Sequence, residues 1–308
     1  MENKATTIST LEDLGERLNV PKGFFEKFEE HREISTFMEK ITIQKRRGHF
    51  RTVYNLLDES YRNILSQIRD LLNKGYNPPE PVHGFIKGRS IFTNAKQHLG
   101  KAVVINIDIR NFFESIPINK VKDIFLSLGF CPEIADVLSK ITCYNGVLAT
   151  GFATSPVISN IICSDMDFEL EILAKSACYT YTRYCDDITF SSSKESKLPR
   201  NNIEEILKNH DFLINDKKYF IQKKGGNQYV TGLTVCEKDR PRIPKKLKKR
   251  LRLESYYINK YGFGGYTERG KKRLLQGPYS ISGRMSYIQK LEPNLVKYMQ
   301  AHTGYSPF

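Results

Sequence analysis

The feature that most constrains this chain is a pair of adjacent carboxylates, Asp186 and Asp187, between two short runs of strand-forming residues. The Tyr, Thr, Ile and Phe residues of segment 179–190 fit a pleated, half-buried surface. Their spacing predicts a β-hairpin with the acids at its tip. Neighbouring anions repel each other unless a cation compensates, and hard divalent cations suit carboxylate oxygens best. By itself, Asp-Asp in a turn is also ordinary surface chemistry.

A third carboxylate closes a mostly apolar run further upstream. Residues 103–107 predict a buried strand, and Asp108 comes where that strand should end. An unpaired buried charge is costly, so this acid indicates a function. We expect the two strands to lie side by side and their acids to converge. Such a site would hold two Mg²⁺ ions about 3.5–4 Å apart and suit in-line phosphoryl transfer.

Three segments, in this order, resemble the motifs of reverse transcriptases. Residues 107–113 resemble the first catalytic strand, residues 150–160 resemble the QGAPTSPxLSN loop and helix, and residues 184–187 resemble the YxDD box. Two further elements, the NAxxH match at 94–98 and the VTG match at 230–232, mark the bacterial retron type. The resemblance covers residues 40–240 approximately. Alternatively, His98 is a solvated helix residue and Thr231-Gly232 is a turn between strands.

This resemblance implies an α+β chain with the right-hand polymerase fold, consisting of fingers, a palm with a small antiparallel sheet, and a helical thumb. Residues 1–240 are expected to form N-terminal helices plus interleaved fingers and palm, and residues 241–308 the thumb. The implied activity is that of an RNA-directed DNA polymerase. It would use dNTPs to copy part of a cognate structured noncoding RNA into single-stranded multicopy DNA, primed from an RNA 2′-hydroxyl. A separate effector protein and a role in anti-phage defence are implied as well.

Two alternatives remain open at this point. One is a scaffold that binds RNA or an RNA–DNA hybrid and restrains a separate effector protein. The other is a reverse transcriptase of the group II intron or diversity-generating type, which would carry a maturase-like extension or a different signature at residues 94–98.

The resemblance also assigns roles to single residues. The expected metal ligands are Asp108, Asp186, Asp187 and the carbonyl of Ile109, with Asp187 contributing more to the shape of the site. The residues expected to meet the incoming nucleotide are Lys45, Arg51, Phe113, Gly151 and Lys218. Among these, Phe113 would exclude a 2′-hydroxyl by its bulk, and Lys218 would protonate the leaving pyrophosphate. The residues expected to meet nucleic acid are Asn94, His98, Val230, Thr231 and Gly232.

The sequence departs from the family pattern in two places. In the loop before residue 155, Thr150 replaces the usual Gln, Phe152 the Ala and Ala153 the Pro. Next to Lys218, Tyr219 stands where Thr is usual. These changes leave open how the loop touches the nucleotide.

Positive charge is concentrated at the C-terminal end. Residues 241–308 contain 15 Lys and Arg against 3 acids, which accounts for +12 of the net +14 of the chain. This is the pattern of a surface that grips a phosphate backbone. Apolar residues recur at helical spacing after Pro244 and predict a folded helix; a membrane-surface helix is the runner-up. The residues that this helix should display to nucleic acid are Lys245, Lys246, Lys248, Lys249, Arg250 and Arg252.

Other features exclude several classes of protein. The six cysteines form no C-x-x-C pair, which argues against structural zinc and favours a cytoplasmic protein with reduced thiols. The N-terminus shows no signal-peptide pattern, and no apolar run approaches the ~20 residues that span a bilayer.

Local patterns predict the remaining elements. A capping box at Ser9 and Glu12 should start the first helix, and the break at 21–23 should separate it from a second. The further helices are expected at 60–74, 120–128, 132–143, 160–174 and 203–209. The further strands are expected at 41–44, 50–54, 211–222 and 228–235.

Overall fold

The structure of the protein is a computed structural model. It describes residues 10–18, 20, 24–25, 37–44, 50–195, 197–269 and 279–307, and only the backbone of residues 266–269 and 279. The chain divides into two compact units, each built from separate segments. Unit 1 comprises Met1–Gly88, Ile107–Ile188 and Lys197–Tyr219, and unit 2 comprises Arg89–Asn106, Thr189–Ser196 and Phe220–Phe308. The domain division expected at residue 240 stays a prediction.

Unit 1 contains most of the helices and two small β-hairpins. The first hairpin, β1–β2, pairs seven residues on each strand, from Met38 opposite Leu56 to Gln44 opposite Phe50. Pro at the first turn suits a helix start and occurs in both α6 and α7. The helices and strands of this unit are α1 (Leu11–Arg17), β1 (Met38–Gln44), β2 (Phe50–Leu56), α3 (Glu59–Gly75), α5 (Ile118–Ser127), α6 (Pro132–Thr142), β4 (Cys143–Tyr144), β5 (Val147–Leu148), α7 (Ser155–Ile162), α8 (Ser164–Ser176), β6 (Thr180–Tyr184), α9 (Arg200–Asn209) and the short 3₁₀ helix η2 (Asp216–Lys218).

Helix α3 shows why these segments fold as they do. Asp58 caps its N-terminus by accepting a hydrogen bond from the Tyr61 amide at 2.6 Å. Its buried residues recur three and four positions apart, as expected for a helix with one apolar face; they are Tyr61, Ile64, Leu65, Ile68 and Leu72. The Tyr61 hydroxyl is satisfied by donating to the Ile141 carbonyl of α6 at 2.6 Å. This helix therefore joins the core of unit 1.

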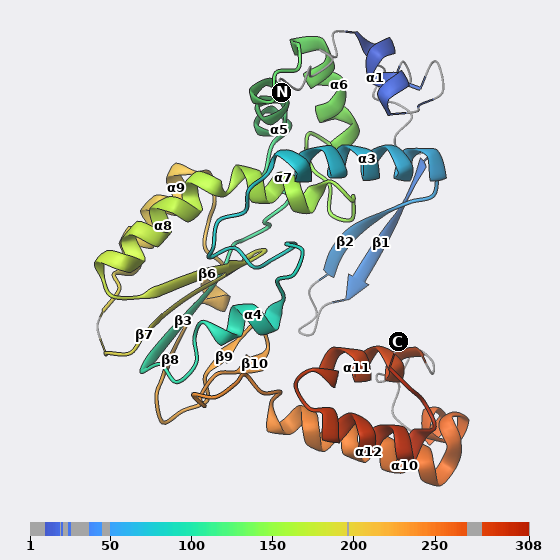
Figure 1. Ribbon diagram of the computed structural model, residues 1–308, viewed down its shortest axis with the longest axis vertical. Coiled ribbons are helices and arrows are strands. Elements are labelled where there is room, and N and C mark those ends of the chain that lie inside the picture. Colours follow the sequence, from blue (N-terminus) through green and yellow to red (C-terminus); the bar gives the residue numbers. More distant parts are fainter. Residues whose placement is uncertain are drawn as a thin grey trace, which may run out of the picture. The chain divides into compact units, whose positions relative to one another are not determined.

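The four-stranded antiparallel sheet has the order β6-β7-β3-β8 (Figure 1). Strands β3 (Val103–Asp108) and β7 (Asp187–Ser192) run through both units, and β8 (Phe220–Lys223) belongs to unit 2. Nearly all side chains of β3 are buried, which explains the apolar run in the sequence. Helices and a small sheet confirm the α+β class.

Unit 2 has a core of its own. Helix α4 (Ile91–Lys96) packs on the short strands β9 (Tyr229–Val230) and β10 (Leu233–Thr234). Helix α10 (Lys245–Arg269) packs on α12 (Pro293–Thr303), which also contacts α11 (Tyr279–Gln289). Buried aliphatic and Met side chains from all these elements form one cluster that includes Val230, Ile243, Leu251, Met285 and Met299. Leu251 and Ile258 are among the apolar residues at helical spacing that predicted this helix, and both side chains are buried.

Several local predictions were wrong in detail. The segment expected as one strand at 211–222 forms a strand only from Phe220, because Asp211 has a left-handed φ of 65° and η2 follows. The strand expected at 228–235 is a hairpin, with Thr231 and Gly232 at its turn. The helix expected at 160–174 is two helices that meet at Cys163.

The first helix is also capped one residue later than predicted. Thr10, not Ser9, is the N-cap residue, and its hydroxyl accepts from the Asp13 amide at 3.0 Å. Asp13 in turn accepts from the Thr10 amide at 3.1 Å, so a shorter acid completes the capping box. Ser9 itself lies outside the described residues, as does the second helix expected after residue 23 apart from residues 24 and 25.

Gly151 occupies a position that only glycine fits. Its φ is +113°, and a Cβ there would lie 2.4 Å from the Tyr54 carbonyl of β2. We expect Gly151→Ala to lower the free energy of unfolding by about 1–3 kcal/mol, because the backbone conformation is strained for alanine and β2 must shift. Gly146→Ala is the matched control, since Gly146 has a φ of +75° with no atom near the added Cβ. Denaturant unfolding of both variants checks this; equal losses would exclude the predicted clash with β2.

Among the described helices, none is both long enough and apolar enough to cross a membrane.

Candidate active site

Asp108 is the last residue of β3, and its side chain is almost fully buried. Both carboxylate oxygens accept hydrogen bonds from one short segment: Asn215 Nδ2 donates to Oδ1 at 2.9 Å, and the Lys218 ammonium donates to Oδ2. The Asn215 amide also donates to the Asp108 carbonyl at 2.8 Å. The predicted catalytic acid is therefore fixed by its backbone and by both oxygens.

The predicted hairpin is present, and its acids lie at the tip. Strand β6 ends at Tyr184, β7 begins at Asp187, and residues 185–187 form what we call the acidic turn. Cys185 takes the left-handed conformation, with a φ of 58°. The Ile109 amide, directly after Asp108, donates to the Asp186 carbonyl at 2.9 Å. This bond places the end of β3 beside the acidic turn.

The three carboxylates influence one another electrostatically. Burial, and next the charge of Asp108, raise the pKa of Asp186. Burial, followed by the charges of Asp186 and Asp108, raises the pKa of Asp187 to about 7. On Lys218, burial lowers the pKa, but the Asp108, Asp186 and Asp187 carboxylates together outweigh it and the pKa lies above its ordinary value. The site thus holds more negative charge than one ammonium compensates.

The donor chemistry of the site fits a divalent cation, although no complete cage is assembled. In the described part of the chain, no group of three or more His, Cys, Asp or Glu side chains is arranged to hold a metal ion. Mg²⁺ is usually bound by one or two carboxylates together with substrate phosphates and water, not by an all-protein cage. Two raised acid pKa values and a buried Asp108 agree with that kind of site.

Among the residues expected to meet the nucleotide, Arg51 lies in the β1–β2 hairpin. Arg51 is exposed on β2, and its charge acts on Asp186 by opposing the rise of the carboxyl pKa. Lys45 lies outside the described residues. Lys218 contacts Asp108 directly, so the structure brings this predicted residue to the acids.

Phe113 lies in a cluster of aromatic rings. Its ring centroid is 5.3 Å from that of Phe112 and 6.3 Å from that of Phe85. Both Phe112 and Phe113 are largely buried, whereas Phe85 is about half exposed and has a φ of 63°. The role of Phe113 as a gate against the 2′-hydroxyl stays a prediction.

The loop that departs from the family pattern, residues 150–153, packs against other segments of unit 1. The Thr150 carbonyl accepts from the Tyr54 amide at 2.9 Å, and the Thr150 hydroxyl donates to Glu114 at 3.3 Å. Phe152 is buried, with its ring 5.8 Å from that of Tyr61. The larger residue thus fills part of the core, and Gly151 is required by the close approach of β2.

The NAxxH and VTG matches lie together in unit 2. His98 Nδ1 is 2.7 Å from Ser191 Oγ, and Thr231 donates to the Ile91 carbonyl at 3.3 Å. The side chains of Asn94, His98 and Val230 are fully buried, while the turn at Thr231 and Gly232 is accessible. Within the described residues, the side-chain amide of Asn94 has no hydrogen-bond partner. A direct contact of these five residues with nucleic acid stays a prediction.

The six basic residues predicted on α10 divide into two groups. Lys248 forms an ion pair with Glu292, and Arg250 forms one with Glu254 at 2.8 Å. Glu254 is buried and also pairs with Arg284. The other four residues are exposed: Lys245, Lys246, Lys249 and Arg252. Next to them on the exposed surface of α10 lie Leu253, Tyr256 and Tyr257.

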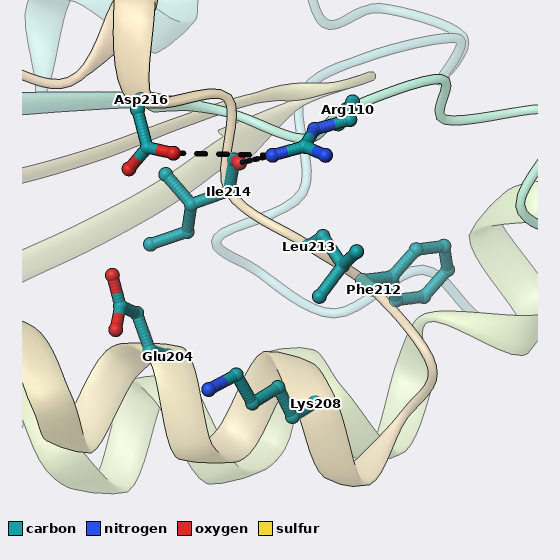
Figure 2. A pocket seen from close by; sticks show the side chains of 7 residues that line it. All are labelled: Arg110, Glu204, Lys208, Phe212, Leu213, Ile214 and Asp216. Carbon is teal, nitrogen blue, oxygen red and sulfur yellow. Dashed lines mark hydrogen bonds and ion pairs between the residues drawn. The ribbon is translucent and has the colours of Figure 1, made fainter.

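A surface pocket of about 170 Å³ lies between α9 and the segment that leads to η2 (Figure 2). Arg110 donates to the Ile214 carbonyl at 3.4 Å and lies 3.9 Å from the Asp216 carboxylate. Two acidic, two basic and three apolar residues line it, and none of the three acids Asp108, Asp186 and Asp187 does. This pocket is therefore separate from the candidate active site.

Sequence reasoning missed the residues that support the acids. Asn215, which donates to Asp108, was not among the predicted site residues, although Lys218 three positions later was. Arg183, Asp167 and Asn160 were not selected at all. The sequence does place an arginine in the middle of a predicted strand, where a charged side chain needs a partner. Arg183 follows Tyr181 by two residues, so both side chains lie on the same face of the strand.

The fold and the position of the acids define a palm of the right-hand polymerase class. The reverse transcriptase (RNA-dependent DNA polymerase) family matches residues 43–235. The Retron Ec86 reverse transcriptase of Escherichia coli is 35% identical over 234 residues, which cover 73% of this chain and 71% of that protein. The Retron Mx162 reverse transcriptase of Myxococcus xanthus is 31% identical, covering 81% of this chain and 59% of that protein. Among solved structures, telomerase from Candida albicans aligns with 13% identity and a TM-score of 0.47 over 88% of this chain and 55% of that chain.

The chain belongs to the reverse transcriptase family and is of the retron type, so the resemblance seen in the sequence is confirmed. It spans 71% of the Ec86 enzyme but less than two thirds of the Mx162 enzyme.

Proposed function

We propose that this chain copies part of a structured noncoding RNA into single-stranded DNA, with Asp108, Asp186 and Asp187 at the reacting end. What supports this most is the hydrogen bond from the Ile109 amide to the Asp186 carbonyl, which joins the end of β3 to the acidic turn. The proposal includes priming from an RNA 2′-hydroxyl and formation of the product from dNTPs.

The three acids, with the Ile109 carbonyl, would hold two Mg²⁺ ions. When bound, such ions lower the pKa of the attacking hydroxyl and neutralise charge on the triphosphate. Asp108 is already oriented by Asn215 and Lys218, so its carboxylate needs little reordering. Burial and mutual repulsion disfavour the ionised forms of Asp186 and Asp187, and the Mg²⁺ ions would compensate these negative charges.

Residues around the acids would position the nucleotide. The Arg51 guanidinium offers two parallel donors to phosphate oxygens, as Lys45 would offer a point charge. Lys218 carries a proton next to Asp108 and would deliver it to the leaving pyrophosphate. Phe113 would exclude ribonucleotides by its bulk, with Phe85 at its side.

Nucleic acid would be gripped by the exposed basic surface of α10. A lysine or arginine without an acidic partner can release counterions from a phosphate backbone on binding. The exposed tyrosines on the same helix offer rings for stacking on bases or sugars. The cognate RNA and its DNA product are the partners that this surface fits best.

The division of the α10 residues into two groups predicts a difference in salt dependence. Lys249→Ala and Arg252→Ala should each weaken template–primer binding and reduce the slope of log K against log salt by about 1. Lys248→Ala should leave the slope nearly unchanged and lower the melting temperature instead, because it leaves the largely buried Glu292 without this partner. Fluorescence anisotropy at several salt concentrations checks this. Equal slopes for all three variants would contradict the division.

The function is tested by the nucleic acid that the protein carries. We expect the protein purified from its host to contain one RNA species together with DNA complementary to part of it. Sequencing with and without debranching would reveal the priming site. The absence of complementary DNA, together with no extension of an RNA-templated primer by the purified protein, would contradict the proposed function.

The proposal extends to a separate effector protein and a role in anti-phage defence. Both can be examined in one experiment, in which host cells carrying Asp186→Asn are challenged with phage. Loss of protection at an unchanged protein level is expected, because the effector would respond to the DNA product. Full protection by that variant would favour a scaffold role.

A further inference from the structure

Arg183, in the middle of β6, is the largest fully buried side chain in the described part of the chain. It stands two residues before the acidic turn, and 0% of its side chain is exposed. A buried charge is costly unless it is paired and hydrogen-bonded throughout. The partners of this guanidinium therefore indicate what it is for.

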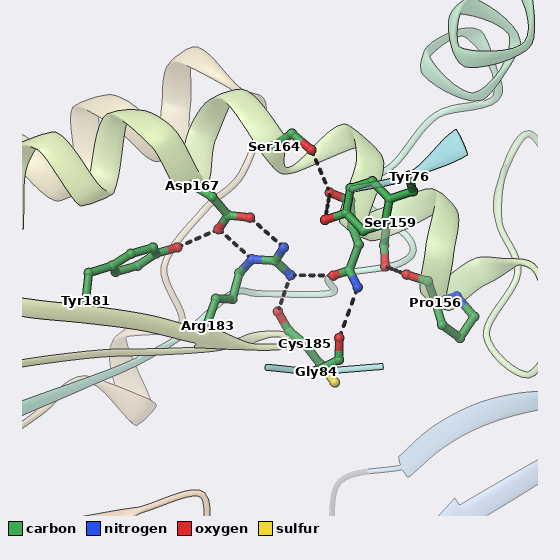
Figure 3. Close-up of polar contacts among 10 residues, drawn as sticks. Tyr76, Gly84, Pro156, Ser159, Ser164, Asp167, Tyr181, Arg183 and Cys185 are labelled. Carbon is green, nitrogen blue, oxygen red and sulfur yellow. Dashed lines mark hydrogen bonds and ion pairs between the residues drawn. The ribbon is translucent and has the colours of Figure 1, made fainter. Parts of the chain in front are cut away.

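The first partner is Asp167 on α8, which is also buried (Figure 3). Arg183 Nε donates to Asp167 Oδ1 and Nη2 donates to Oδ2, both at 2.7 Å. These parallel bonds form the bidentate geometry that orients a guanidinium most strictly. The Tyr181 hydroxyl donates to Asp167 Oδ1 at 2.6 Å. Burial, and next the Asp167 charge, raise the pKa of Tyr181 well above its ordinary value, so this hydroxyl keeps its proton.

The remaining nitrogen reaches the acidic turn. Arg183 Nη1 donates to the Cys185 carbonyl and to Asn160 Oδ1, each at 3.1 Å. Asn160 in turn donates through Nδ2 to the Gly84 carbonyl at 3.0 Å. Cys185 holds a left-handed conformation that residues other than glycine rarely adopt. The guanidinium thus restrains the carbonyl of the residue directly before Asp186.

The backbone of Arg183 is held from the other side by residues 81–84. Its amide donates to the Pro81 carbonyl at 3.0 Å, and its carbonyl accepts from the His83 amide at 2.8 Å. Gly84 passes so close that a Cβ would lie 2.3 Å from the Cys185 nitrogen. The acidic turn is therefore enclosed between this segment and the guanidinium.

We propose that Arg183 is a positioning residue, which fixes the acidic turn through Cys185 and so sets where the Asp186 carboxylate stands relative to Asp108. Asp167, Tyr181 and Asn160 hold the guanidinium in the orientation that this requires. This inference rests on the proposed nucleotidyl transfer. Displacement of a reacting group by about 1 Å costs roughly 10²-fold in rate, so removal of the restraint should slow catalysis without weakening substrate binding.

The test separates the restraint from the contribution of the ion pair to stability. A triple variant, Arg183→Met, Asp167→Leu and Tyr181→Phe, replaces the polar group with apolar side chains of similar size, which folded proteins often tolerate. We expect this variant to remain folded and to bind template–primer and dNTP as the wild type does. Its kcat for RNA-templated primer extension should fall about 100-fold.

Arg183→Lys is the second variant, since an ammonium can pair with Asp167 but cannot span Asp167 and Cys185 as a planar fork does. A comparable fall in kcat at unchanged KM for dNTP is expected. As a control, Lys122→Gln with Asp136→Asn removes the Lys122–Asp136 ion pair between α5 and α6 and the Lys140–Asp136 pair within α6, both of which lie outside this network. The control should extend primers at the wild-type rate.

Wild-type kcat in either folded variant would overturn the inference. So would failure of both variants to fold, because Arg183 would then serve the fold alone. Wild type and Asp186→Asn are measured alongside. If the wild type does not extend primers, the proposed function fails. If the wild type is active and the Arg183 variants are equally active, only the positioning role is removed.

Discussion

Replacement of Asp186 with asparagine is expected to reduce RNA-templated primer extension by about 10³-fold or more. A carboxylate that holds a catalytic cation supplies several kcal/mol of transition-state stabilisation, and each 1.36 kcal/mol corresponds to a tenfold change in rate. Single-turnover incorporation of one dNTP measures the effect. Asp70→Asn, at an exposed acid on α3, is the control and should be as active as the wild type.

The same variant should not lose stability, which separates a functional acid from a structural one. The pKa of Asp186 is raised in the folded protein, so the folded chain binds this proton more tightly than the unfolded chain does. Stability therefore falls as the pH rises above the unfolded pKa, and the ionised carboxylate destabilises the fold at pH 7. Thermal unfolding without divalent cations should give Asp186→Asn a melting temperature equal to or above that of the wild type. A large decrease would mean that Asp186 supports the fold.

Lys218→Gln is the substitution with the second largest expected effect. The Lys218 ammonium contacts Asp108, and the negative charges of Asp186 and Asp187 act on it as well. Loss of a proton donor typically costs about 10²–10⁴-fold in rate, and we expect primer extension to fall within that range. The neighbouring Lys217 is exposed, and Lys217→Gln should have little effect.

Lys218→Arg distinguishes proton donation from simple charge compensation. Arginine keeps the positive charge beside Asp108 but does not release its proton at accessible pH. If Lys218 protonates the leaving pyrophosphate, the arginine variant should be as slow as the glutamine variant, and the alkaline limb of the pH–rate profile should disappear in both. Wild-type activity of Lys218→Arg would show that only the charge is needed.

The sequence predicted those parts of the fold that depend on neighbouring residues. The strand ending at Asp108 and the hairpin around residues 185–187 are local patterns of apolar and β-forming residues, and both are present. The basic helix after Pro244 was predicted from its period, and α10 begins at Lys245. The resemblance to the family was found from three motifs in the right order, and the family match over residues 43–235 confirms it.

The parts that could not be predicted depend on contacts between distant segments. Arg183 gains its role from Asp167 and Asn160, which belong to helices and approach it only in the folded chain. The segment 211–222 was predicted to be one strand, whereas Asp211 adopts a left-handed turn. Likewise, Lys248 is paired with Glu292, which lies far away in the sequence, whereas the pair of Arg250 and Glu254 follows the i,i+4 spacing of a helix.

Cation binding tests the central assignment most directly. Electron paramagnetic resonance can count Mn²⁺ bound to the protein in the presence of template–primer and a non-hydrolysable dNTP. We predict two bound ions for the wild type and a loss of at least one in both Asp108→Asn and Asp186→Asn, although Asp108 ends β3 and Asp186 lies in the acidic turn. Unchanged Mn²⁺ binding in both variants would contradict the view that these carboxylates form a common site for nucleotidyl transfer.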